Sequence, residues 1–225
     1  MAKTPLIGMT MEELQDVCLQ LSMPKFTAKQ MAQWIYGKHV HAIDEMTNLS
    51  KGNREKLDSL FCVGCSAPLE TSRSVDGTIK YLFPTESGKF VETVYIPDGD
   101  RATLCVSCQV GCKMNCLFCQ TGKQGWQGDL TVRDILNQIY TVDQLMAQEG
   151  GTPLSNIVYM GQGEPLDNID NVLKSAEILT ADYGWAWSPR RITISTVGLK
   201  KNMRRLLDEC ECHIAVSLHS PIHEQ

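Results

Sequence analysis

From residue 102 onward, the sequence alternates short apolar segments with segments of helical periodicity. Four segments have the length and composition of strands: 102–106, 156–160, 191–196 and 213–218. Between them lie three segments with apolar residues at helical spacing: 132–148, 169–179 and 201–207. Repeated strand–loop–helix units predict a parallel sheet or barrel with functional residues on the loops that follow the strands. Since a complete (β/α)8 barrel takes ~250 residues, we predict a partial, TIM-like barrel that is open at one edge.

The first hundred residues follow different patterns. Residues 10–63 carry apolar side chains at helical spacing, and Ser50 is placed to cap a helix that runs to Leu60. Residues 67–97 contain three strand-like runs separated by Asp76-Gly77 and Ser87-Gly88, which is typical of an antiparallel meander. We therefore predict an α/β chain of three parts. These are a small helical accessory domain over 1–66, a short β meander over 67–100, and the N-terminal half of a barrel over 101–225.

The composition is that of an ordinary globular chain, with 43% hydrophobic and 21% charged residues. No apolar run approaches ~18 residues and the N-terminus lacks the apolar segment of a signal peptide, so we expect no membrane span and a cytoplasmic location. The net charge of −5 gives no overall attraction to nucleic acids, so any RNA contact must come from local basic patches. The candidate patches are Lys51, Arg54 and Lys56; Arg190 and Arg191; and Lys200, Lys201, Arg204 and Arg205.

Ten cysteines are many for a chain without an export signal, and they favour metal binding or catalysis over disulfides. Cys112, Cys116 and Cys119 are separated by three and then two residues on one predicted loop. Three thiolates on such a loop can hold three irons of a [4Fe–4S] cube and leave the fourth iron open for catalysis. A structural zinc site is the alternative, since Cys105 or Cys108 could supply the fourth ligand that zinc requires.

Glycine-rich and polar segments follow the other predicted strands. Gly161-Gln162-Gly163-Glu164-Pro165 follows the second strand; its glycines allow close approach to the backbone, and Glu164 can accept hydrogen bonds from an amine. Ser195 ends the third strand, and Ser217, Leu218 and His219 end the fourth. A plain turn, helix capping or surface exposure would also explain these residues. Their shared position at strand ends favours contact with one bound cofactor.

Together these motifs resemble the radical S-adenosylmethionine superfamily, and within it the RlmN/Cfr group of RNA methyltransferases. The resemblance covers nearly the whole chain and rests on four segments: 104–112, 118–122, 160–168 and 215–219. It implies a radical SAM barrel behind a helical accessory domain, and as cofactors a [4Fe–4S] cluster with an open iron and S-adenosylmethionine. Glu164-Pro165-Leu166 and Gln109-Val110-Gly111 resemble the branch that methylates adenine C2 rather than C8.

The resemblance also implies roles for individual residues. Cys112, Cys116 and Cys119 would ligate the cluster. Contacts to S-adenosylmethionine would come from Gly163, Glu164, Ser195, Ser217, Leu218 and His219. Cys105 would resolve a covalent protein–RNA intermediate, and Glu92 would act as a proton acceptor. Without the resemblance, Cys105 would be interpreted as a small buried residue and Glu92 as an exposed strand carboxylate.

The implied activity is methylation of adenosine C2 in 23S rRNA and in tRNA. It would proceed through a methylated cysteine and a 5′-deoxyadenosyl radical, with electrons from a donor such as flavodoxin. The methyl-carrying cysteine of the group lies near the C-terminus of its longer members, and Cys210 and Cys212 do not match it. We therefore expect the 225-residue chain alone to be incomplete for turnover. A C8-specific methyltransferase and a different radical SAM enzyme are the alternatives.

Overall fold

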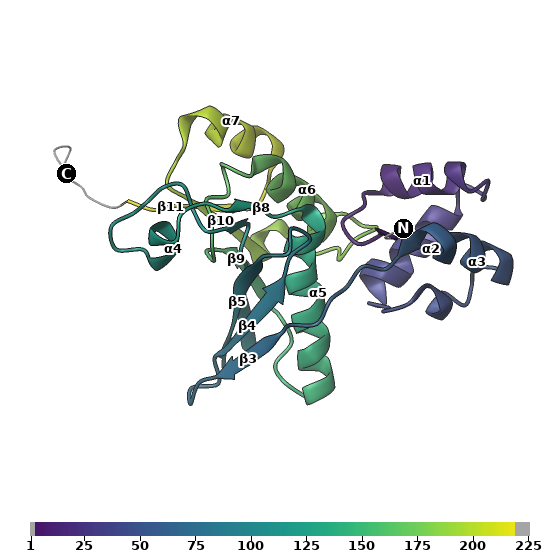
Figure 1. Ribbon diagram of the computed structural model, residues 1–225, viewed down its shortest axis with the longest axis horizontal. Helices are drawn as coiled ribbons and strands as arrows, with labels where there is room; N and C mark the ends of the chain where they lie inside the picture. Colours follow the sequence, from purple (N-terminus) through teal and green to yellow (C-terminus); the bar gives the residue numbers. More distant parts are fainter. Residues whose placement is uncertain (1–2, 219–225) are drawn as a thin grey trace.

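The computed structural model describes residues 3–218, and its centre is a seven-stranded mixed sheet (Figure 1). In spatial order the strands are β11 (His213–Val216), β10 (Ile192–Thr196), β9 (Asn156–Tyr159), β6 (Arg101–Cys105), β5 (Phe90–Asp98), β4 (Ile79–Pro84) and β3 (Glu70–Arg73). The pairs from β6 to β11 are parallel, and the pairs from β3 to β6 are antiparallel. The predicted α/β class with a partial barrel is therefore confirmed.

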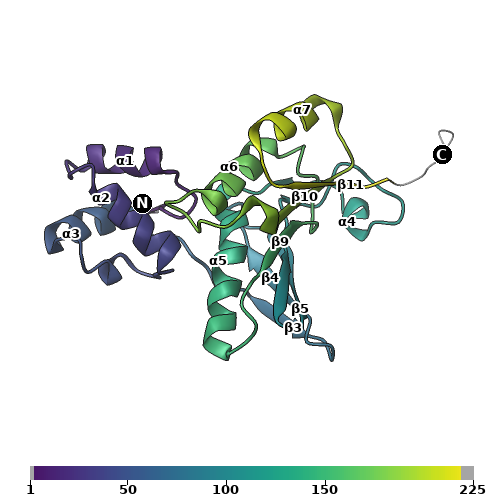
Figure 2. The same ribbon diagram turned by 180° about the vertical axis from the view of Figure 1, so that it is seen from behind.

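Helices cover one face of this sheet (Figure 2). The two long ones are α5 (Val132–Glu149) and α6 (Ile169–Thr180), and α7 (Lys200–Glu209) packs beside α6. α5 begins at Thr131, because the Thr131 hydroxyl accepts a hydrogen bond from Asp134 N–H while the Asp134 carboxylate accepts one from Thr131 N–H. All three helices begin and end within two residues of their predicted bounds.

The opposite face of the sheet carries partly exposed side chains. Along β5, Val91 and Thr93 are buried whereas Glu92 and Val94 are half-buried, and β6 and β10 alternate in the same way. Successive residues of a strand point to opposite faces of the sheet. Glu92, Cys105 and Ser195 therefore share the face that α5 and α6 leave open.

The meander predicted over 67–100 forms, but it is not a separate sheet. β3, β4 and β5 pair antiparallel, and β5 then pairs with β6, which places Val94 opposite Cys105. A tight turn between Asp98 and Arg101 joins the two strands, so the chain cannot leave the sheet at this point. The predicted boundary between residues 100 and 101 lies inside this hairpin. The division into three folding units therefore stays a proposal.

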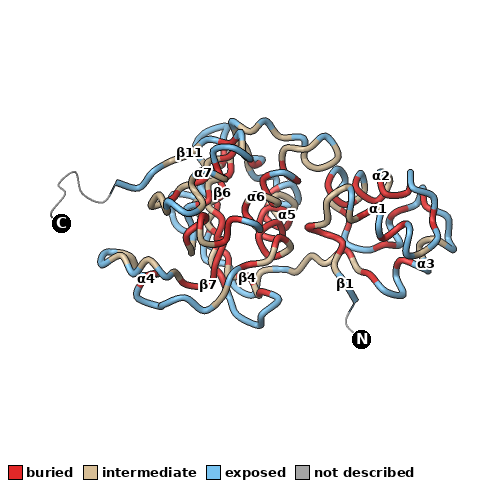
Figure 3. Tube along the Cα trace, turned by 90° about the horizontal axis from the view of Figure 1, so that it is seen from above, coloured by how far each residue is buried: buried red, intermediate tan, exposed pale blue. Residues whose placement is uncertain are grey.

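The N-terminal part is helical, as predicted. Its helices are α1 (Met11–Gln20), α2 (Thr27–Ala32) and α3 (Lys51–Leu60), with a π-helical turn η1 (Gln33–Gly37), a 3-10 turn η2 (Ile43–Glu45), and the short parallel pair β1 (Thr4–Pro5) and β2 (Phe61–Cys62). Thr10 and Ser50 cap α1 and α3 through hydrogen bonds from the N–H groups of Glu13 and Asn53. Buried segments run through both this part and the sheet (Figure 3).

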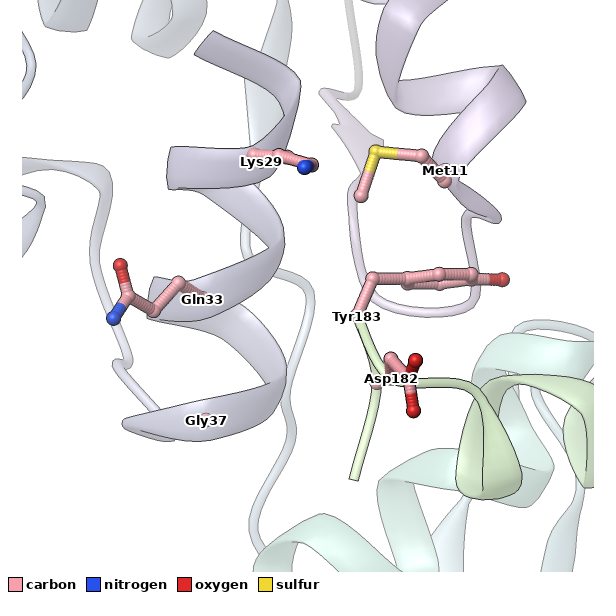
Figure 4. A pocket seen from close by; sticks show the side chains of 7 residues that line it. Met11, Lys29, Gln33, Gly37, Asp182 and Tyr183 are labelled. Atoms are coloured by element: carbon pink, nitrogen blue, oxygen red, sulfur yellow. The ribbon is translucent and has the colours of Figure 1, made fainter. Parts of the chain in front are cut away.

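α5 joins the helical part to the sheet. Arg133 Nε donates to the Gly64 carbonyl at 2.8 Å, and Tyr140 Oη donates to the Val40 carbonyl at 2.5 Å. Further along this junction, a cavity of about 580 Å³ lies between Lys29 and Gln33 on one side and Met11, Asp182 and Tyr183 on the other (Figure 4). Within the described part of the chain, no predicted site residue lines this cavity.

Candidate cofactor site

The cysteine loop stands on a two-stranded ladder that the sequence did not predict. β7 (Gln109–Val110) pairs antiparallel with β8 (Gly128–Asp129), so residues 111–127 form a closed loop. Gly111 makes this closure possible, because its φ is 71° and a Cβ there would lie 1.7 Å from the Gly125 carbonyl oxygen. Figures 1 and 2 place the loop, with its short helix α4 (Gln120–Lys123), at the opposite end of the molecule from the helical part.

The loop brings Cys112, Cys116 and Cys119 near one another. All three are half-buried free thiols, and Cys119 N–H donates to the Cys116 carbonyl at 3.0 Å. Burial raises the pKa of Cys112, a hydrogen bond from Met114 N–H opposes this shift, and charge on Cys116 and Cys119 adds to it. Among residues 3–218, no three side chains already converge as metal ligands. Three free thiols on one loop are nevertheless the donor set that a [4Fe–4S] cluster takes, so the residues fit that group.

The turn at 161–165 lies directly against the base of the cysteine loop. Gly163 has a φ of 104°, and a Cβ there would lie 2.6 Å from Gln109 Cβ. The Gln162 carbonyl accepts hydrogen bonds from the N–H groups of Cys108 and Gln109, at 2.9 and 3.1 Å. The backbones of the two motifs are therefore in contact, as expected for loops that follow neighbouring parallel strands.

Glu164 is buried, and protein groups already bind its carboxylate. Oε1 accepts from Leu166 N–H at 3.0 Å and from the Thr196 hydroxyl, and Oε2 accepts from Val197 N–H at 3.0 Å. A carboxylate offers about four acceptor positions, so about one remains for a ligand amine. Glu164 therefore ties the turn after β9 to the end of β10, and its contact with a cofactor stays a prediction.

The predicted residues at the ends of β10 and β11 lie side by side. Ser195 Oγ is 3.4 Å from Ser217 Oγ, and Ser217 N–H donates to the Thr196 carbonyl at 2.8 Å. The Leu218 side chain is exposed. His219 lies outside the described residues. Cofactor contact by these four residues stays a prediction.

Cys105 and Glu92 lie on adjacent strands and on the same open face of the sheet. Cys105 pairs with Val94, two residues from Glu92, so the two side chains are diagonal neighbours. The Glu92 carboxylate is half-exposed and pairs with Lys80 Nζ at 2.8 Å. Burial raises the pKa of the Cys105 thiol, although a hydrogen bond with the Met160 backbone opposes the shift, so the thiol is protonated at neutral pH. The predicted roles of both residues stay predictions.

Cys210 and Cys105 should respond differently to pH in the iron-free chain. A hydrogen bond from the Cys212 thiol lowers the pKa of Cys210 to about 7. Because the thiolate is the nucleophile, iodoacetamide should modify Cys210 at a rate that reaches half its maximum near pH 7 and levels off at more alkaline pH. The rate at Cys105 should still be rising above pH 9, since its pKa is raised above the ordinary value of 9.0. Peptide mass spectrometry of timed samples measures both rates. Equal rates in the folded chain at pH 7 would contradict the different pKa values of the two thiols. As the control, the two rates should be equal in urea.

A ring of polar side chains lies at the foot of the cysteine loop, and the sequence did not predict it. Its members are Gln109, Lys113, Trp126, Asp129 and Asp167, joined by three hydrogen bonds, an ion pair and a cation–π contact. Burial raises the pKa of Asp167, but hydrogen bonds from Lys113 and Gln109 outweigh it and lower the pKa below its ordinary value. The only signal in the sequence was polar residues beside two predicted loops, which does not reveal the pairing.

Comparison with known proteins identifies the superfamily to which the chain belongs. Residues 106–223, more than half of the chain, match the family model of the Radical SAM superfamily, and residues 4–63 match that of the Ribosomal RNA large subunit methyltransferase N-terminal domain. The chain therefore belongs to the radical SAM superfamily, whose members use a [4Fe–4S] cluster and S-adenosylmethionine. Among the described residues, no helix has the length and hydrophobicity needed to cross a membrane.

Within that superfamily the chain is similar to RlmN proteins. It is 57% identical over 223 residues to a probable dual-specificity RNA methyltransferase RlmN of Phocaeicola vulgatus. The aligned residues cover 99% of this chain and 62% of the relative. It is 39% identical to the dual-specificity RNA methyltransferase RlmN of Alcanivorax borkumensis, over 99% of this chain and 59% of that one. The crystal structure of a radical SAM methyltransferase from Sphaerobacter thermophilus superposes with a TM-score of 0.89 at 37% identity, covering 97% of this chain and 64% of that one. The predicted resemblance to the RlmN/Cfr group is thus confirmed, and the chain spans about 60% of the length of these proteins.

Proposed function

We propose that the protein to which this chain belongs methylates C2 of adenosine in 23S rRNA and in tRNA. One observation carries the proposal: the cysteine loop and the turn at 161–165 are in backbone contact. In addition, Cys105 and Glu92 share the open face of the same sheet. The RlmN relatives, whose names describe dual-specificity RNA methyltransferases, support the reaction and its substrates. We further propose a cytoplasmic location and an electron donor such as flavodoxin.

In this proposal Cys112, Cys116 and Cys119 hold the cluster, and Gly163, Ser195 and Ser217 contact S-adenosylmethionine. When bound, the two groups supply the one-electron chemistry that an aromatic C2 requires. The loop glycines bring the backbone close to the cofactor, and Glu164 fixes the turn against β10. Cys105 is a neutral thiol on the open face and would need an acceptor for its proton. Half-exposed Glu92, its diagonal neighbour on β5, would serve as that acceptor.

RNA contact would use basic side chains that the fold leaves unpaired. Arg191 is not one of them, since it donates to the carbonyls of Leu154 and Ser155 and lies over the Trp187 ring. Lys200 and Lys201 are exposed at the start of α7, and the charge on Lys201 reaches Asp167 beside the cysteine loop. These lysines support phosphate contact near the site. The target adenine would have to leave its stack to reach the open face, which is easiest in an RNA loop.

Nucleoside mass spectrometry tests the proposal. Ribosomal RNA and tRNA from cells with and without the full-length gene are digested, and their methylated adenosines are quantified. We expect 2-methyladenosine to disappear from both RNAs when the gene is absent, while N6-methyladenosine stays constant as the control. An unchanged amount of 2-methyladenosine would reject the proposal, and loss of 8-methyladenosine instead would assign C8 methylation.

A further inference from the structure

Gln109 lies where the cysteine loop meets the turn at 161–165, and its side chain is completely buried. Its amide makes three hydrogen bonds. Nε2 donates to Asp129 Oδ1 at 2.7 Å and to Asp167 Oδ2 at 2.9 Å, and Oε1 accepts from Glu164 N–H at 2.9 Å. These partners belong to the returning arm of the cysteine loop, to the segment that leads into α6, and to the 161–165 turn. One side chain thus connects three separate segments.

Two further members of the ring, Lys113 and Trp126, belong to the cysteine loop itself. Lys113, which directly follows Cys112, pairs with Asp167 at 2.8 Å and lies 4.2 Å from the centre of the Trp126 ring. Trp126 Nε1 in turn donates to Asp129 Oδ1 at 3.1 Å. Both arms of the loop are therefore fixed to each other and, through Asp167, to the neighbouring loop.

The chemistry of this position requires a primary amide. Two carboxylates need two donors, and the Glu164 N–H needs an acceptor; glutamine offers both kinds of group in one side chain. A glutamate at 109 would place a third carboxyl group against Asp129 and Asp167, and a methionine would leave a buried N–H without an acceptor. The Gln109 Cβ also occupies the space that a side chain at Gly163 would take.

We propose that Gln109 is a positioning residue that sets the distance and angle between the cluster loop and the loop that binds S-adenosylmethionine. The inference rests on the proposed function of the two loops. Gln109 contributes no ligand to the cluster, so it should affect how S-adenosylmethionine binds without affecting how much iron the three cysteines hold.

The test compares Gln109→Glu with the wild-type chain after anaerobic reconstitution with iron and sulfide. Iron content and the electron paramagnetic resonance spectrum of the reduced cluster are measured with and without S-adenosylmethionine. We expect unchanged iron content but a Kd for S-adenosylmethionine raised about tenfold, as for the loss of one or two buried hydrogen bonds. Gln124→Glu, in an exposed residue of the same loop without a side-chain hydrogen bond, is the matched control and should change neither quantity.

Two further variants separate positioning from simple loss of folding. Gln109→Glu combined with Asp129→Asn and Asp167→Asn reverses both donor–acceptor pairs of residue 109. It gives up the acceptors of Trp126 Nε1 and Lys113, so it should recover only part of the affinity. Asp167→Asn alone weakens the interactions of Asp167 with Gln109 and Lys113 and should raise the Kd about threefold. An unchanged Kd in Gln109→Glu, or parallel loss of iron and affinity without rescue, would overturn the inference. A wild-type chain that forms no cluster would overturn the proposed function, and the inference with it.

Discussion

Replacing Cys112, Cys116 or Cys119 by serine should leave the chain unable to keep an iron–sulfur cluster. Each thiolate holds a different iron of the cube, and a serine hydroxyl does not replace it, so one substitution removes one corner of the site. After anaerobic reconstitution, iron should fall from about four atoms per wild-type chain to below about one in each variant. Iron determination and the visible absorption of the protein measure the loss.

Other cysteines of the same chain supply the controls. Cys62→Ser and Cys210→Ser change partly exposed thiols outside the loop and should keep the cluster. Cys105→Ser should also keep it, because three ligands suffice for a cluster with an open iron. If Cys105→Ser removed the metal as completely as Cys112→Ser, a four-ligand site such as zinc would replace the cluster in our assignment.

Glu164→Ala should destabilise the iron-free chain by about 4 kcal/mol, because it leaves two buried donors and one half-buried donor without an acceptor. The N–H groups of Leu166 and Val197 and the hydroxyl of Thr196 all donate to this carboxylate. An alanine offers them no acceptor, and each buried donor left unpaired costs about 1–3 kcal/mol. Urea unfolding followed by circular dichroism measures the free energy of unfolding.

Glu70→Ala is the matched control for this measurement. Glu70 lies exposed on β3 and makes no side-chain hydrogen bond or ion pair, so its loss should change stability by no more than about 0.5 kcal/mol. A cost below about 1 kcal/mol for Glu164→Ala would mean that water replaces the lost carboxylate. In that case the Glu164 carboxylate would serve chiefly to bind a ligand rather than to hold the turn after β9 against the end of β10.

The regular elements were predictable because each carries its information locally. The alternation of β5 and the helical spacing of α5 each fix a burial pattern, and Thr131 and Ser50 mark helix starts by their capping chemistry. β7 and β8 were missed because two-residue strands are too short to show a period. The pairing of β5 with β6 was also missed, although Asp98-Gly99 is a local turn signal of the kind that joins two antiparallel strands.

The site was predictable only in part for a related reason. The spacing of Cys112, Cys116 and Cys119 is a local signal that by itself indicates an iron–sulfur cluster. The three bonds of Gln109 and the bonds from Thr196 and Val197 to Glu164 join residues from 20 to 58 positions apart, and nothing in the sequence marks such partners. Sequence motifs thus identified the groups that would touch a cofactor, whereas the groups that hold them in place became visible only in the fold.

The position of α5 between the helical part and the sheet has a consequence for synthesis. Arg133, Asn137 and Tyr140 supply hydrogen bonds to residues 40–66, but they follow that segment in the chain by roughly 70 residues or more. At about 5–20 residues per second, the helical part would wait roughly 4–14 seconds before α5 is made. During that interval the carbonyl groups of Val40, Gly64 and Ser66 lack these donors on the nascent chain, so the junction forms only after α5 is made.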